Sequence, residues 1–293
     1  MTADEAASVP LLHQGRAVAD YRWRPRLAHD LAPRPYLHPV RTLAGTEVTE
    51  HLPADHPHHL GAGVAVPDIS GANFWGGRTF VANRGPVMLA NHGTQQHHNW
   101  LHRAPGEVVH ELRWCGPDGA ELLRERRRIA VLPAGPGWAV DLSFELTNRT
   151  ALPITFASPA TKGRPGAGYG GFFWRAPRTP QGVRAYGPGP GGEKGLHGRR
   201  TAWLALTGTG TNGRRWTLVF VQAGPDGLDD PWFVRTRDYP GIGSALAWDR
   251  PLLLASGDAV SRRFLIVVAD GILPARGAAE AAFAALRHVG GPY

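Results

Sequence analysis

Apolar and polar residues alternate with a period of two along the middle of the chain. Glu107–Cys115 and Glu121–Leu132 alternate in this way and flank the turn sequence Gly116-Pro-Asp-Gly119, and Trp138–Asn148 alternates throughout its length. Successive side chains of a strand point to opposite faces of a sheet, so this pattern predicts strands with one buried face. A Pro-Asp-Gly turn between two such runs indicates a hairpin. The region is therefore expected to be an antiparallel meander.

Shorter apolar runs, bounded by Gly, Pro, Asn or Asp, predict further strands. They lie at Arg16–Trp23, Gly61–Val66, Pro153–Ser158, Ala202–Thr207, Arg215–Gln222, Trp232–Arg235, Ser244–Trp248, Leu252–Ala255 and Val260–Ala269. One helix is expected over about Arg276–His288, with Phe283 and Leu286 on one face. Strands and helices do not alternate. The sequence thus predicts an all-β fold, a large antiparallel two-sheet sandwich with one C-terminal helix.

Length and composition agree with one domain of this kind. The chain has 293 residues, and its 38 Gly and 26 Pro are scattered between apolar runs, as in proteins with many tight turns. We expect residues 1–15 to form a loose leader and residues 16–293 to form a single β-sandwich domain. The leader has no apolar signal-peptide core, and no run of 18 apolar residues occurs, so a cytoplasmic protein without a membrane span is expected.

The net charge of +8 does not by itself indicate nucleic-acid binding. Most basic residues are single arginines spread along the chain, and the densest run, Arg124–Arg128, lies in a predicted strand. Charge spread in this way lacks the clustered basic surface that a nucleic acid requires. The single cysteine, Cys115, excludes an internal disulfide and a cysteine-based zinc site.

Histidines are concentrated between Asp55 and Trp100. Six of the 14 histidines lie in two short stretches rich in Gly and Asn: His56, His58, His59, His92, His97 and His98. Histidine titrates near neutral pH and ligates metals, so this concentration predicts proton transfer or metal binding. The alternatives are hydrogen bonds to loop backbone for the first stretch and a polar surface loop for the second.

The sequence Asp55-His-Pro-His-His59 is the strongest candidate for catalysis. Pro57 stiffens the loop, so the neighbouring rings can be held in distinct directions. A carboxylate beside them is suited to accept one ring N–H and thereby select a tautomer. The catalytic candidates are Asp55, His56, His58, His59 and His98. Three imidazoles and a water also suit Zn²⁺, and the candidate ligands are His56, His58 and His59.

Aromatic side chains and one arginine are candidates for contacts with a substrate. The flat faces of Trp75, Trp100 and Trp174 are suited to pack on the C–H face of a sugar ring. Arg175 is suited to hold a carboxylate or keto oxygen through its planar fork, and His97 is a further binding candidate. Core packing of the aromatic rings and a surface ion pair of the arginine are the alternatives.

The chain resembles a bacterial family known as PmoA-like. The matching phrases follow the family's order from about residue 33 to about residue 275: Arg34–Gly61, Gly71–Gly77, Trp138–Asn148, Gly170–Arg175, Ala202–Gly208, Asp230–Gly241 and Leu252–Gly271. The DHPHH phrase followed by the GANFW phrase is the most specific part. After Thr161-Lys162 the chain departs from the family, because a long glycine-rich insertion precedes Arg175 where many members have Glu-Gly and soon an Arg.

This resemblance implies a β-sandwich related to the galactose-mutarotase-like supersandwich. It also implies a sugar or oxidised-sugar substrate, because members of the family accompany genes for sugar oxidoreductases and carbohydrate catabolism. The family label, methane oxygenase, would instead imply a metal-dependent oxygenase. Asp55 and two histidines are of the residue types that such an iron site uses.

The sequence therefore predicts a carbohydrate-active enzyme that uses clustered histidines for general acid/base chemistry. The substrate is expected to be a sugar or keto-glycoside, and the reaction that of a lyase or hydrolase, or of an epimerase or mutarotase. The alternative is a non-catalytic sugar-binding or accessory protein, and the metal-dependent oxygenase is a lesser one. The expected partner is a small carbohydrate, with no nucleic acid and no membrane.

Overall fold

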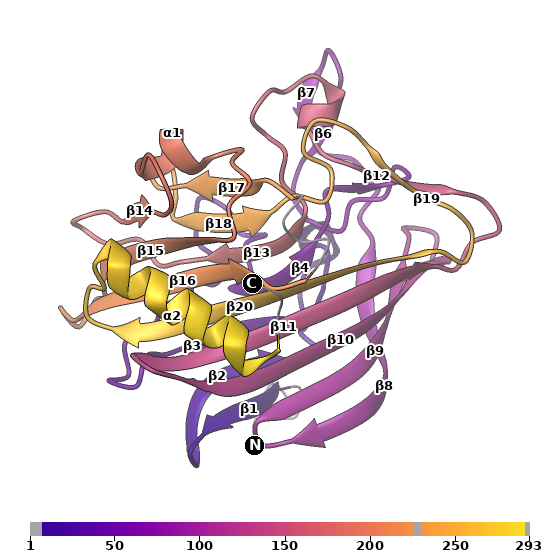
Figure 1. Cartoon of the computed structure of the whole chain (residues 1–293). Helices are drawn as coiled ribbons and strands as arrows, with labels where there is room; N and C mark the ends of the chain where they lie inside the picture. Colours follow the sequence, from indigo (N-terminus) through magenta and orange to yellow (C-terminus); the bar gives the residue numbers. More distant parts are fainter. Residues whose placement is uncertain (1–7, 225–229, 291–293) are drawn as a thin grey trace.

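The computed structural model describes residues 8–224 and 230–290, and most of the chain lies in two large antiparallel sheets (Figure 1). The seven-stranded sheet has the order β1 (Ser8–His13), β2 (Arg16–Arg22), β3 (Tyr36–Val40), β4 (Ala62–Ala65), β13 (Gly171–Arg175), β18 (Gly241–Ser244) and β17 (Trp232–Arg235). The eight-stranded sheet has the order β14 (Arg184–Tyr186), β15 (Trp203–Thr209), β16 (Arg215–Gln222), β20 (Ala259–Asp270), β11 (Gly137–Asn148), β10 (Glu121–Ala134), β9 (Glu107–Cys115) and β8 (Thr94–Ala104).

Smaller elements extend this framework. They are the three-stranded sheet of β19 (Leu252–Leu254), β12 (Ile154–Ala157) and β5 (Asp68–Ile69), the hairpin of β6 (Thr79–Val81) and β7 (Gly85–Val87), and the helices α1 (Gly192–Leu196) and α2 (Ala275–His288). Figure 1 shows α2 lying across the outer face of the eight-stranded sheet, where it contacts β16 and β20. The predicted all-β sandwich with a C-terminal helix is confirmed.

The alternation of β13 explains why the seven-stranded sheet has two different faces. Phe172 and Trp174 point into the core between the sheets, and the indole Nε1 of Trp174 donates a hydrogen bond to the Val48 carbonyl at 2.8 Å. Phe173 lies on the opposite face, in a separate apolar cluster with Trp75. Its neighbours in register, on β4 and β18, are glycines, which leave room for large rings above this outer face.

A buried polar network connects the sheets near β9 and β10. The guanidinium of Arg127 pairs with the Glu125 carboxylate at 2.6 Å, and both side chains are almost inaccessible to solvent. Arg127 also donates to the Gln95 side chain at 3.0 Å and to the Pro35 carbonyl at 3.2 Å. Glu125 accepts a further hydrogen bond from the Trp114 indole at 2.7 Å. A buried ion pair held by so many partners stabilises the fold only as a complete unit.

Part of the predicted N-terminal leader is a strand of the sheet. Ser8–His13 forms β1, which pairs with β2, and alternate side chains place Val9 and Leu11 in the core. The prediction failed because this run is short and interrupted by Pro10, which weakens the strand pattern. Residues 1–7 of the predicted leader lie outside the described residues.

Two other predictions were wrong in detail. β18 covers Gly241–Ser244, so the strand predicted over Ser244–Trp248 was placed too late, because the sequence GIGS has little apolar signal. In α2 the side chain of Phe283 is 44% exposed, and the buried residues are four alanines and Leu286. Small side chains allow the helix to lie close to the sheet. No helix in the described ranges is long and apolar enough to cross a membrane.

Candidate functional site

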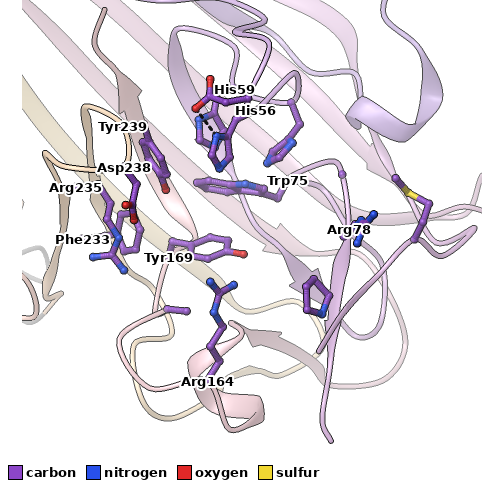
Figure 2. Close-up of a pocket in the computed structure, with 16 residues that line it drawn as sticks. His56, His59, Trp75, Arg78, Arg164, Tyr169, Phe233, Arg235, Asp238 and Tyr239 are labelled. Atoms are coloured by element: carbon purple, nitrogen blue, oxygen red, sulfur yellow. Dashed lines mark hydrogen bonds and ion pairs between the residues drawn. The ribbon is translucent and has the colours of Figure 1, made fainter. Parts of the chain in front are cut away.

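A cavity of about 570 Å³ opens above the outer face of the seven-stranded sheet. Its lining residues come from five segments that are distant in the sequence: 55–59, 75–78, 86–88, 164–169 and 233–239. Figure 2 shows the histidines of the first segment at one end, Trp75 and Tyr169 along one wall, and Arg164 at the other end. The cavity thus brings together part of the predicted site and several residues that were not predicted.

Arg34 holds the histidine loop in place. Its buried guanidinium donates hydrogen bonds to the carbonyls of Leu31 and Ala32, and at 2.6 Å to the carbonyl of His58. The backbone N–H of His59 donates to the His56 carbonyl at 2.9 Å, which closes a tight turn around Pro57. These bonds satisfy backbone groups that a loop would otherwise leave to water, so the imidazoles are presented from a fixed backbone.

Gly76 and Gly77 make room for the ring of His58. Both glycines have positive φ angles, +94° and +68°. A Cβ atom on Gly77 would lie 2.8 Å from Nδ1 of His58, and one on Gly76 would lie 2.8 Å from the Cβ of His58. Glycine is needed at these positions both for the backbone conformation and for this close approach.

We expect Gly77→Ala to displace the His58 ring. The matched control is Gly71→Ala, because Gly71 also has a positive φ, +95°, but a Cβ there would meet nothing within 4 Å. Both variants are expected to lose about 1–2 kcal/mol of stability from the left-handed backbone. Only Gly77→Ala should move the ¹H–¹⁵N ring correlations of His58 in an NMR spectrum. Equal spectra for the two variants would contradict this account of the glycine pair.

Asp55 and His56 form a hydrogen-bonded pair at the cavity. Oδ2 of Asp55 lies 2.8 Å from Nδ1 of His56. A carboxylate can only accept, so Nδ1 carries the proton, and the neutral ring keeps its lone pair on Nε2. Partial burial acts to raise the pKa of Asp55, but hydrogen bonds from His56 and Arg178 and the charge of Arg175 outweigh it and hold the pKa below its usual range. Asp55 therefore stays ionised beside the imidazole.

His58 and His59 are neutral at physiological pH. Burial, followed by the charges of Arg34 and His56, lowers the pKa of His58 to about 3. Burial also holds the pKa of His59 well below its usual value, with smaller effects from the neighbouring histidines and Arg175. The His59 ring stacks on His56 with centroids 4.7 Å apart. These two rings are therefore suited to hydrogen bonding, whereas His56 has the carboxylate partner that a proton carrier needs.

The depressed histidine pKa values predict a loss of stability in mild acid. Burial lowers the pKa most for His38, His58, His59 and His110, to about 3 for His38 and His58 and to about 2 for His110. In the unfolded chain these groups bind protons below about pH 6.5, whereas the folded protein excludes them until a lower pH. The free energy of unfolding should therefore fall as pH decreases from about 6.5 to about 4.

Each fully buried histidine contributes about 1.4 kcal/mol per pH unit in that window. Urea unfolding at pH 7.5, 6 and 5 measures the slope. His110 is fully buried, so His110→Gln should reduce the slope by the contribution of one histidine, about 1.4 kcal/mol per pH unit. A free energy of unfolding that stays constant between pH 7.5 and 5 would contradict the prediction.

Aromatic side chains form one wall of the cavity. The Trp75 ring lies 4.6 Å from Tyr169 and 4.9 Å from Phe173, and Tyr239 lies 4.7 Å from His56 between ring centroids. Burial raises the pKa of Tyr169 to about 12 and raises that of Tyr239 as well, so both hydroxyls stay protonated. Within the described part of the chain neither hydroxyl has a hydrogen-bond partner. They are free to bind a ligand that enters the cavity.

Two predicted binding residues lie behind or outside the cavity. Trp174 is fully buried in the core, so its predicted role in stacking on a sugar is corrected. Arg175 is also fully buried: its Nε donates to the Glu50 carboxylate at 2.8 Å, and its guanidinium packs 4.9 Å from the ring of Tyr239. Arg175 therefore supports the cavity wall from behind and does not reach a ligand.

The second group of histidines does not join the first. His97 and Trp100 lie on β8, where the His97 Nδ1 is 3.0 Å from Nδ1 of His110 and the Trp100 ring stacks on His110. His98 is exposed on the same strand. None of these three predicted residues lines the cavity, because the strand carries them away from it. Only His92 approaches it: its Nε2 lies 2.7 Å from the Gly77 carbonyl and supports the glycine pair.

The first group of histidines is not arranged as the predicted zinc site. The planes of the stacked His56 and His59 rings differ by 19°, so their nitrogen lone pairs run side by side and do not converge on one point. Across residues 8–224 and 230–290, no three His, Cys, Asp or Glu side chains form a group that could hold a metal ion. Proton transfer and hydrogen bonding are the chemistry that this geometry supports.

Several lining residues were missed by sequence reasoning. They are Arg78, Pro86, Met88, Arg164, Ala167, Tyr169, Phe233, Arg235, Asp238 and Tyr239. A signal was present for two of the segments. Tyr169 lies in the long glycine-rich insertion, and loops of that length in a compact domain are usually functional. Tyr239 lies in the phrase DPWFVRTRDYPG, which contributed to the family resemblance.

Three solved structures match most of this chain at 10–11% sequence identity. An α-galactosidase from Lactobacillus brevis matches 92% of this chain with 10% identity and a TM-score of 0.45. A polysaccharide lyase matches 90% with 11% identity and a TM-score of 0.36. A provisionally assigned aldose 1-epimerase from Escherichia coli K12 matches 92% with 11% identity and a TM-score of 0.32. The matches span 40%, 33% and 80% of those chains, so this chain corresponds to less than half the length of the first two.

Comparison of sequences is more specific about the family. No curated protein matches the sequence. The PmoA-like assignment made from the sequence has no support in these comparisons. A family model described as a family of unknown function, DUF6807, matches residues 8–284, which is nearly the whole chain. The chain therefore belongs to the family DUF6807.

Proposed function

We propose that this protein is an enzyme that acts on a carbohydrate bound in the cavity, with Asp55 and His56 as its general acid/base pair. The observation that carries the proposal is the 2.8 Å hydrogen bond between Asp55 and Nδ1 of His56 at the cavity. A carboxylate in this position stabilises the imidazolium that forms when Nε2 takes a proton. His56 and Trp75 both line the cavity (Figure 2).

The surrounding groups suit a sugar. Trp75 lines the cavity with 5% of its surface exposed, so it offers a small apolar contact for the C–H groups of a sugar. The hydroxyls of Tyr169 and Tyr239 and the neutral rings of His58 and His59 supply hydrogen bonds for ring oxygens and hydroxyls. A site with an aromatic wall and several convergent polar groups is typical of small-molecule recognition.

The chemistry follows from the pair. Nε2 of His56 removes a proton from a sugar hydroxyl, or from a carbon acidified by an adjacent carbonyl, and Asp55 stabilises the resulting charge. The Tyr239 hydroxyl, whose ring lies beside both His56 and His59, donates a hydrogen bond to the oxygen that gains negative charge. From the hydroxyl on the anomeric carbon, transfer of the proton to the ring oxygen opens the ring, and closure on the other face of the new C=O group completes a mutarotation. From an acidified carbon, return of the proton to the opposite face of the same carbon is an epimerisation. Delivery of that proton to a glycosidic oxygen at the β position instead breaks the C–O bond, forms a C=C bond and releases the leaving group as an alcohol.

A second candidate is a non-catalytic sugar-binding protein. The neutrality of His58 and His59 favours it, because hydrogen bonding to a sugar needs no ionisable group. The two candidates differ over Asp55 and His56. A binding protein has no use for a proton carrier, whereas the proposed enzyme depends on one.

An NMR time course with free sugars, glycosides and 3-keto-glycosides tests the proposal. We expect at least one spectrum to change with time, as a faster approach to anomeric equilibrium or as a cleaved product. The reaction seen would also identify the type of enzyme. Ligand line broadening with no change in composition across the panel would overturn the enzyme and support the binding protein.

A further inference from the structure

The charges of the cavity are not balanced by the protein itself. Arg235 is engaged, since it donates to the Gly166 carbonyl at 3.1 Å and lies 3.6 Å from the Glu193 carboxylate. By contrast, Arg78 and Arg164 have no ion pair and no side-chain hydrogen bond with any residue in the described part of the chain. Both are exposed lining residues. The cavity therefore presents two arginine side chains that are free to bind.

The acidic groups of the cavity do not offset these two arginines. Asp55 is already held by His56 and Arg178, at 2.8 and 2.6 Å. Asp238 also lines the cavity, and Figure 2 shows its carboxylate beside Arg235 and Tyr239, on the side of the cavity away from Arg78. One free carboxylate on that side leaves an excess of positive charge around Arg78 and Arg164.

Backbone hydrogen bonds hold the loop that carries Arg164 and the residue before Arg78. The N–H of Arg164 donates to the Pro159 carbonyl at 3.0 Å, and the Arg164 carbonyl accepts from Ala167 at 3.2 Å. Arg78 follows Gly77, whose N–H donates to the Asp30 carbonyl at 2.7 Å. Arg164 lies near the Tyr169 hydroxyl, at the end of the cavity opposite the histidines (Figure 2).

We propose that the substrate is a sugar that carries an anionic group, either a carboxylate or a phosphate, and that Arg164 binds this group, with Arg78 adding to the positive charge of the cavity. The guanidinium fork pairs with the oxygens of both groups through charge-assisted hydrogen bonds. The anion binds remote from Asp55 and His56, so the negative charge sets the direction of the sugar and leaves the reacting end at the histidines. This inference rests on the proposed function for the identity of the ligand as a sugar.

Calorimetric titration with glucose, glucuronate and glucose 6-phosphate tests it. Glucuronate or glucose 6-phosphate should bind at least about 10-fold more tightly than glucose, because a hydrogen bond between two charged groups is roughly twice as strong as one between neutral groups. Arg164→Gln should weaken binding of the anionic sugar about 10-fold, Arg78→Gln should weaken it less, and neither should change binding of glucose. The matched control is Arg126→Gln, an exposed arginine on β10 that does not line the cavity.

The comparison of the two anionic sugars identifies which group the site accepts. Equal affinities for all three sugars, or equal effects of the three substitutions, would overturn the inference. Binding of inorganic phosphate as tight as that of glucose 6-phosphate would also overturn it, because the site would then recognise an isolated anion. Tight binding of an anionic sugar without turnover would contradict the proposed enzyme and leave this inference standing. Turnover of neutral sugars but not of anionic sugars would support the proposed enzyme and contradict this inference.

Discussion

Replacing Arg127 by methionine is expected to lower the free energy of unfolding by about 3–5 kcal/mol. Both members of the pair are buried, with 1% of the Arg127 side chain and none of Glu125 exposed. Removal of the guanidinium leaves the Glu125 carboxylate in the core with a hydrogen bond from the Trp114 indole, at 2.7 Å, in place of the ion pair. The uncompensated charge is costly there because water cannot reach it.

Urea unfolding of Arg127→Met, monitored by tryptophan fluorescence, measures this loss. Arg126→Met is the control, because Arg126 is the exposed neighbour on the same strand, and a change within about 0.5 kcal/mol is expected. The double variant Glu125→Met/Arg127→Met should recover much of the loss, since it removes both charges. A single-variant loss below about 1 kcal/mol would show that the network contributes little. The substitution should also affect the candidate site. Arg127 donates a hydrogen bond to the carbonyl of Pro35, and the preceding residue, Arg34, holds the histidine loop.

His56→Gln is expected to lower turnover of a sugar substrate by about 10²–10⁴-fold, with binding retained. Glutamine keeps a polar group at this position but cannot carry a proton at neutral pH. Asp55→Asn should have a similar effect, because an amide does not stabilise the imidazolium and no longer requires the proton on Nδ1. The measurements are the initial rate by NMR on whichever sugar reacts, and the ligand affinity by titration.

His98→Gln provides the control. His98 was also predicted to be catalytic, yet it is exposed on β8 and does not line the cavity, so turnover should not change. Full turnover in His56→Gln would exclude the proposed acid/base pair. Loss of binding and stability in parallel with turnover would indicate that His56 has a structural role.

Local properties of the sequence determined much of the framework. β9 has the predicted bounds, and β10 and β11 differ from theirs by one or two residues, because alternation along a strand depends only on near neighbours in the sequence. The first half of the site was also predictable. Asp55 and the three histidines after it are adjacent in the chain, and a short turn keeps them together.

The rest was decided by which strands pair and which face they present. Phe173 and Trp174 are adjacent aromatic residues, but Phe173 packs against Trp75 on the cavity side and Trp174 lies in the core, because β13 alternates between the two faces of its sheet. Strand pairing also decides the positions of His97, which lies away from the cavity, and Tyr239, which lines it. Pairing of β8 with β9 takes His97 to His110, whereas the loop between β17 and β18 returns Tyr239 to His56.

The sequence by itself thus determined the strand pattern, the sandwich and the histidine loop, since these follow from residues close together in the chain. Only the tertiary structure decided that Tyr169, Tyr239, Arg164 and Arg78 share one cavity with that loop. Contacts between segments more than a hundred residues apart depend on long-range strand pairing and side-chain packing. A local pattern of apolar and polar residues does not determine which distant segment it will contact.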